Sequence, residues 1–155
     1  MTEISPAPDD TPLPAFLRAA RTTYGSAMRA ALAEAGCDDI PGNGMFVIGA
    51  LARFGTPLAR IIRELRVTKQ AAGQLVDTLV LRGYLEREID PADRRRLTLS
   101  LTERGKAAAA AQRSAVDQVD AELLKRVGPD YIAHTRATLG VLIDMQREAE
   151  EADPA

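Results

Sequence analysis

Apolar residues recur at helical spacing along most of the chain and predict a mostly α-helical fold. Glycines interrupt this pattern: Gly36, Gly55 and Gly83 each follow a predicted helix, and Gly128-Pro129 separates the last two. Several of the predicted helices follow a threonine, whose hydroxyl can cap the free N–H groups of a helix start. We therefore expect helices at about 13–36, 44–54, 57–65, 69–82, 103–127 and 130–150.

The segment between residues 84 and 101 alternates apolar and polar residues, which is typical of half-buried strands. The two predicted strands are Tyr84–Glu88 and Leu97–Leu101, and Asp90-Pro91 breaks the alternation between them. The strands should pair as a hairpin. The predicted fold class is therefore mostly α with a small β-hairpin.

The predicted helix at 69–82 has two faces of different chemistry. At about 100° per residue, one side gathers five apolar residues: Ala71, Ala72, Leu75, Val76 and Leu79. The roughly opposite side holds short or hydrogen-bonding residues: Lys69, Gln70, Gly73, Gln74 and Asp77. A short helix, a tight turn and a helix of this kind together predict a helix-turn-helix, whose second helix enters the DNA major groove.

The polar face carries groups that can recognise a duplex. Gln70 and Gln74 can each pair with an adenine edge, and Lys69 can contact guanine or a phosphate. The free N–H groups near Thr68 also favour a phosphate, and Gly73 lets the backbone come close to the groove. The same residues suit an ordinary solvated helix, so this helix by itself leaves both interpretations open.

Three consecutive arginines, Arg94, Arg95 and Arg96, stand at the predicted tip of the hairpin. They would repel one another there, whereas a duplex and its narrow minor groove would attract them. Asp93 can hold one arginine while another reaches out. Residues 57–106 carry 11 Lys/Arg against 7 Asp/Glu, and the rest of the chain carries 9 against 15. A basic middle of this kind favours a polyanion partner, with a flexible charged loop as the alternative.

The stretch "VTKQAAGQLVDTLVLRGYLEREIDPADRRRLTLSLTERG", residues 67–105, resembles the MarR family of winged helix-turn-helix transcriptional regulators. The shared pattern consists of Leu75, Val76, Asp77, Leu79, Arg82-Gly83, Tyr84-Leu85, Arg87, Asp93-Arg94-Arg95, Leu101-Thr102 and Gly105. The resemblance implies a single domain at 13–150. A winged lobe at about 41–105 would be flanked by dimerisation helices at about 13–36 and 107–150.

The resemblance further implies a homodimer on a pseudo-palindromic site in double-stranded DNA. It implies repression, often relieved by a small anionic or aromatic ligand. By position, Arg95 matches the family's minor-groove arginine, and Asp93 matches the residue that braces it. Gln74 and Thr78 stand where the family often has arginine, which leaves the operator sequence open.

The long terminal helices favour a dimer on physical grounds as well. Their apolar stripes exceed what the small lobe can cover, so they need a partner; a monomeric helical bundle is the alternative. On the first helix, Arg18, Arg21 and Tyr24 can meet the carboxylate or phenol of an effector. Surface charge and core packing are the other roles open to these three residues.

Composition narrows the class of protein. A single cysteine, Cys37, excludes an internal disulfide and favours a cytoplasmic location. No apolar run reaches the roughly 18 residues that a membrane-spanning helix needs. The acidic, proline-rich residues 1–12 are expected to form a disordered tail.

Few reactive groups lie outside these motifs. Cys37 suits a structural role, because the adjacent Asp38 and Asp39 disfavour its thiolate. Two alternative functions of the protein stay open: a cysteine-based redox-sensing regulator and a winged-helix protein-interaction module. His134, the only histidine, makes no metal site by itself. Asp38 and Asp39 are expected to be solvated. The sequence shows no catalytic constellation or cofactor motif, so we expect neither an enzyme nor a bound cofactor.

Overall fold

The computed structural model describes residues 10–54, 67–89 and 97–152. These residues form helices and one antiparallel hairpin, in the order α1 (Leu13–Glu34), α2 (Gly44–Phe54), α4 (Lys69–Leu81), β1 (Leu85–Ile89), β2 (Leu97–Leu101), α5 (Glu103–Val127) and α6 (Pro129–Ala152). The prediction of a mostly helical fold with a small hairpin is confirmed. The predicted helix at 57–65 and the hairpin tip lie outside the described residues.

Local signals fix the ends of the helices. The side chain of Thr68 accepts a hydrogen bond from the backbone N–H of Ala71 (3.1 Å), and Thr102 caps α5 through the N–H of Gly105 (3.0 Å). Gly128, with a φ of 81°, ends α5, and Pro129 is the first residue of α6. The start of α4 and both ends of α5 therefore follow from caps and breaks that the sequence itself displays.

The first strand begins at Leu85, one residue later than predicted. Gly83 has a φ of 74°, and the N–H of Tyr84 bonds to the carbonyl of Leu79 (2.9 Å). This arrangement is the Schellman end of a helix, so Tyr84 belongs to the termination of α4 rather than to the strand ladder. The pairing then runs from Leu85 opposite Leu101 to Ile89 opposite Leu97.

The core of the lobe lies between α2, α4, the hairpin and the first half of α5. Its largest fully buried side chains are Tyr84, Ile48, Leu79, Leu85 and Val47. Ala72, Val76 and Leu79 are the buried positions of α4, as the helical pattern predicts. Ala71, which was assigned to the same face, is exposed instead, because it lies at the edge of the apolar stripe.

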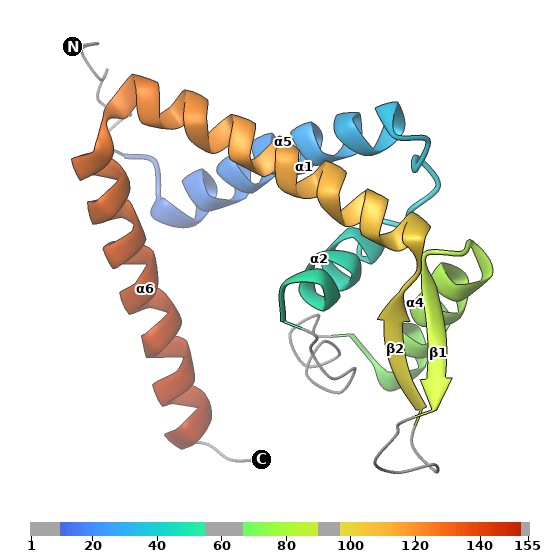
Figure 1. The fold of residues 1–155 in the computed structure, drawn as a ribbon. Coiled ribbons are helices and arrows are strands. Elements are labelled where there is room, and N and C mark those ends of the chain that lie inside the picture. Colours follow the sequence, from blue (N-terminus) through green and yellow to red (C-terminus); the bar gives the residue numbers. More distant parts are fainter. Residues whose placement is uncertain (1–9, 55–66, 90–96, 153–155) are drawn as a thin grey trace.

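The helices at the two ends of the chain lie outside this lobe. Figure 1 shows α1 running alongside α5, and Tyr24 of α1 donates a hydrogen bond to Asp120 of α5 (2.5 Å). Helix α6 turns away at the far end of α5 and contains no buried residue. The chain therefore consists of a packed lobe and a group of long helices that extend from it.

Candidate nucleic-acid interface

The polar face of α4 points away from the core. Lys69, Gln70 and Gln74 are exposed, whereas Ala72, Val76 and Leu79 bury the opposite side against the lobe. Thr68 at the helix start is also exposed, and its hydroxyl is used in the cap. The structure thus brings together five residues predicted from the sequence on one accessible surface: Thr68, Lys69, Gln70, Gly73 and Gln74.

No side chain projects from the polar face of α4 at Gly73. A Cβ built on Gly73 would meet no atom within 4 Å, so nothing in the described chain requires glycine there for packing. Gly73 is itself partly exposed, between the exposed residues Gln70 and Gln74. A helix with short or hydrogen-bonding outward side chains is the shape that fits a major groove about 12 Å wide.

The helix is fixed against the hairpin by an ion pair. Arg87 of β1 donates a hydrogen bond to the carboxylate of Asp77 on α4. Both side chains are partly solvent-exposed, so the pair orients the two elements more than it stabilises the fold. The sequence analysis placed Asp77 on the polar face and named no partner for it. Arg87, on the strand that follows α4, was the signal that could have indicated this contact.

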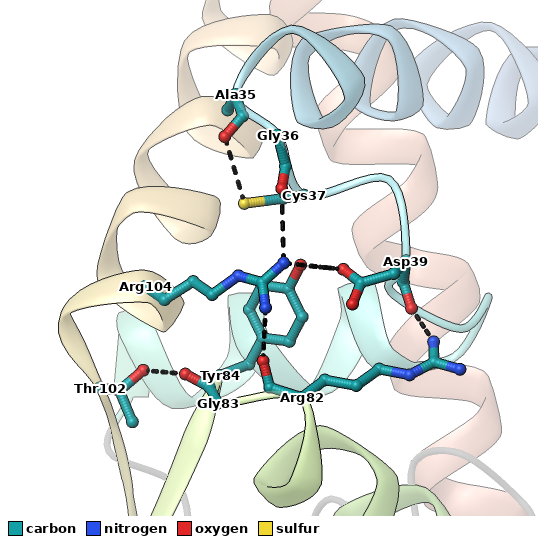
Figure 2. A network of polar contacts seen from close by, with 9 residues as sticks. All are labelled: Ala35, Gly36, Cys37, Asp39, Arg82, Gly83, Tyr84, Thr102 and Arg104. Carbon is teal, nitrogen blue, oxygen red and sulfur yellow. Dashed lines mark hydrogen bonds and ion pairs between the residues drawn. The ribbon is translucent and has the colours of Figure 1, made fainter.

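A second group of polar contacts lies where α1, α4, β1 and α5 meet, and sequence reasoning missed it (Figure 2). We call it the junction cluster and define it as Gly36, Asp39, Arg82, Tyr84 and Arg104. Arg104 donates to the carboxylate of Asp39 (3.1 Å) and lies 4.3 Å from the centroid of the Tyr84 ring. It also donates to the carbonyl oxygens of Arg82 (2.6 Å) and Gly36 (3.4 Å). One guanidinium on α5 therefore contacts both the segment that follows α1 and the segment that ends α4.

Asp39 is the acceptor at the centre of the junction cluster. Its carboxylate accepts from the hydroxyl of Tyr84 and from Arg104, and its carbonyl oxygen accepts from Arg82. The hydrogen bond from Tyr84, assisted by the charge of Arg104, lowers the pKa of Asp39 although partial burial opposes the shift. The expectation that Asp39 is merely solvated was wrong, because the fold brings these distant donors to it.

The hydroxyl of Tyr84 is held in its protonated form. The Tyr84 side chain is fully buried, and this burial, followed by the hydrogen bond to Asp39, raises the pKa of the phenol far above its ordinary value. Tyr84 therefore serves as a permanent hydrogen-bond donor to Asp39.

The start of α5 packs directly on the end of α4. The Thr102 hydroxyl donates to the carbonyl of Gly83 (2.5 Å), and the N–H of Thr102 bonds to the carbonyl of Tyr84 (3.2 Å). A Cβ on Gly105 would lie 2.1 Å from the Tyr84 oxygen. Only glycine allows this approach, so Gly105 sets how closely α5 lies against the lobe.

These features agree with the comparisons to known proteins. The sequence profile of the MarR family matches residues 38–96, which include α2, α4 and β1. Residues 38–96 of the chain therefore match the MarR family. A search among curated proteins finds no match.

Solved structures of MarR proteins share the fold over nearly the whole chain. A crystal structure of MarR is 19% identical, covers 96% of this chain and 100% of its own, and superposes with a TM-score of 0.73. Wild-type apo MarR from E. coli is 21% identical, with 86% and 98% covered and a TM-score of 0.62. A mutant of S. aureus MepR bound to an oligodeoxyribonucleotide is 18% identical, with 88% and 99% covered and a TM-score of 0.51. The MarR fold therefore extends beyond the matched segment to the terminal helices.

Three of the predicted DNA contacts belong to the MarR-like wing. Asp93, Arg94 and Arg95 lie outside the described residues, and their roles stay predictions.

In the part of the chain that the structure does describe, no helix has the length and apolarity to cross a bilayer.

The predicted effector residues of the MarR-like first helix differ in their surroundings. Arg18 and Arg21 are exposed on α1. Tyr24 is half-buried, and its hydrogen bond to Asp120 raises the pKa of its phenol. The Tyr24 hydroxyl thus already has a partner within the chain, and ligand binding by these residues stays a prediction.

Cys37 and His134 have different environments. The Cys37 side chain is 3% exposed and its Sγ lies 3.6 Å from the carbonyl oxygen of Ala35. Such burial limits the access of an oxidant and fits the structural role expected for this residue.

His134 is exposed on α6. Among the described residues, no group of three or more His, Cys, Asp or Glu could hold a metal ion.

Proposed function

We propose that the chain is a sequence-specific DNA-binding transcriptional regulator that binds a pseudo-palindromic operator as a homodimer. The observation that carries the proposal is the face of α4. Lys69, Gln70 and Gln74 are accessible around an open Gly73, while the opposite side of the helix is packed into the lobe. This face lies within residues 38–96, the segment that matches the MarR family.

In this proposal α4 enters the major groove. Gln70 and Gln74 contact base edges, because a side-chain amide can both donate to and accept from adenine. Lys69 contacts guanine or a phosphate near the start of the helix. Arg94 and Arg95, held by Asp93, contact the adjacent minor groove and its phosphates. The MepR mutant with the same fold is itself bound to an oligodeoxyribonucleotide, which supports this use of the fold.

Exposed apolar side chains support the homodimer. Most of them lie on α1, the second half of α5 and α6, the helices that extend from the lobe in Figure 1, whereas Phe46, Leu81 and Ile89 are exposed on the lobe itself. Examples are Leu17 (39% exposed), Leu124 (47%), Ile143 (53%) and Met145 (58%). A soluble monomer rarely leaves so much apolar surface in one region uncovered, and a second copy related by a two-fold axis would bury it.

Repression and its relief by a small ligand complete the proposal. A dimer on an operator would block transcription, and an anionic or aromatic ligand between the long helices and the lobe would release it. Arg18, Arg21 and Tyr24 are the residues that we propose for such a ligand. Tyr24 lies next to Asp120 in the second half of α5, so a ligand bound there would contact the two long helices from which the lobe extends.

Selection of DNA fragments by the purified protein, from random and genomic pools, tests the proposed function. We expect a two-fold symmetric sequence to emerge and a gel shift with the corresponding duplex. Affinity should fall steeply between 50 and 200 mM salt, by roughly 10³-fold or more if six phosphates are contacted. Arg95→Ala should weaken binding without changing the far-UV circular dichroism.

Two results would contradict the proposal. Failure to enrich any sequence, together with capture of a protein partner through α4, would favour a winged-helix interaction module. A monomer in analytical ultracentrifugation at micromolar concentration would contradict the dimer. Measuring both properties on the same preparation separates loss of assembly from loss of DNA binding.

A further inference from the structure

The junction cluster lies where the lobe meets the long helices. Gly36 and Asp39 follow the end of α1, Arg82 ends α4, and Arg104 lies in the first turn of α5. These segments are 22 to 68 residues from Arg104 in sequence, yet each has an acceptor within hydrogen-bond distance of its guanidinium. Figure 2 shows the Arg104 guanidinium between Asp39, the Gly36 carbonyl and the Arg82 carbonyl.

Arginine is suited to this position by its shape. Its planar guanidinium offers several N–H donors in fixed directions, so contacts to Asp39, Gly36 and Arg82 define an angle between the segments as well as a distance. The Tyr84 ring, 4.3 Å away, adds a flat surface on which the cation lies. A lysine would keep the charge but not these directions.

The exposure of the pair argues that its main effect is on geometry. The side chains of Arg104 and Asp39 are 42% and 40% exposed, and ion pairs this accessible to water add little to the unfolding free energy. The buried residues Tyr84, Leu79 and Leu85 already hold the lobe together. The contacts made by Arg104 instead restrict how the lobe is tilted against α1 and α5.

We propose that Arg104 and Asp39 are positioning residues for operator binding, which set the angle between the α4-bearing lobe and the helices α1 and α5. The inference rests on the proposed function, in which α1, α5 and α6 join two copies. In a two-fold dimer, a tilt of the lobe relative to these helices occurs in both copies. The separation of the two α4 helices then changes, and this separation must match half-sites about one helical turn apart.

The test uses the full-length protein and the operator duplex that the wild-type protein selects. The variants are Asp39→Asn, which keeps an oxygen acceptor and removes the charge, and Arg104→Gln. Asp38→Asn removes the same charge from the exposed neighbouring residue, and Arg113→Gln removes an exposed arginine that pairs with Asp117 on α5; these are the matched controls. Each protein is titrated with the operator, with versions one base pair longer or shorter between the half-sites, and with a single half-site.

Arg104→Gln should bind the native spacing about tenfold more weakly, because apparent affinity falls with the fraction of molecules in the competent arrangement. In both variants, the difference in affinity between operators of native and altered half-site spacing should become smaller, while the affinity for a single half-site equals that of the wild type. The control variants should match the wild type in both measurements. A contact that only stabilised the fold would lower thermal stability and leave the spacing preference unchanged.

The outcomes separate this inference from the proposed function. If the wild-type protein selects no DNA, the proposed function fails and the inference fails with it. If the wild type binds but both variants keep its spacing preference, the positioning role is wrong and the DNA-binding function stands. Should both variants unfold, the cluster holds the fold itself and the positioning role is likewise overturned.

Discussion

Gly73 lies within the exposed face of α4, and its replacement separates folding from DNA binding. A Cβ at this position meets no atom within 4 Å, so alanine fits without displacing a neighbour. Because glycine loses more conformational freedom in a helix, Gly73→Ala should raise the free energy of unfolding by about 0.5–1 kcal/mol. For a chain of this size, a change of that order raises Tm by about 1–4 °C.

DNA affinity should change in the opposite direction. We propose that the space above Gly73 is filled by the groove, so an added side chain would hold the helix away from the bases. Gly73→Leu should weaken operator binding at least about tenfold, which is about 1.4 kcal/mol at 25 °C, and Gly73→Ala should have a smaller effect. Thermal unfolding followed by circular dichroism and fluorescence-anisotropy titration with a labelled operator measure the two properties independently.

A matched substitution elsewhere in the lobe provides the control. Gly49 lies in α2, and a Cβ there would be 3.6 Å from Oε1 of Gln112, an ordinary contact distance. Gly49→Ala should therefore stabilise its helix and leave operator affinity unchanged. If both Gly73 variants bound the operator as tightly as the wild type, α4 would not approach DNA through this face. A lower Tm for Gly73→Ala would contradict the open surroundings of that residue.

Three further substitutions test other parts of the structure. Gln74→Ala should cost about 1–3 kcal/mol of discrimination at one base pair per half-site, seen as relaxed preference at that position when DNA selection is repeated. Gly105→Ala should lower the free energy of unfolding by about 1–3 kcal/mol, because its Cβ would lie 2.1 Å from the Tyr84 oxygen; an unchanged urea midpoint would contradict this packing. The Tyr84 hydrogen bond and the Arg104 charge lower the pKa of Asp39 below its ordinary 3.8. The ionised Asp39 carboxylate therefore stabilises the fold above pH 3.8, and this stabilisation is lost as the pH falls through the lower pKa of the folded state. Asp39→Asn should accordingly make acid unfolding below pH 3.8 less dependent on pH; Asp38→Asn, which leaves the contacts of Asp39 in place, is the control.

The sequence by itself determined the elements and their faces. Thr68 and Thr102 cap helices, and Gly83 and Gly128 end them, because these signals act within a few residues of the backbone that they satisfy. The apolar spacing of Ala72, Val76 and Leu79 was enough to orient α4. The exposed residues Lys69, Gln70 and Gln74 followed from the same periodicity.

Only the tertiary structure decided how the elements meet. Asp39 is 45 residues from Tyr84 and 65 from Arg104, and no periodicity of the sequence relates positions that far apart. From the sequence, Asp39 was indistinguishable from its solvated neighbour Asp38. Close approach at Gly105 brings α5 onto the end of α4, and this packing makes the carboxylate of Asp39 the shared acceptor of the Tyr84 hydroxyl and the Arg104 guanidinium.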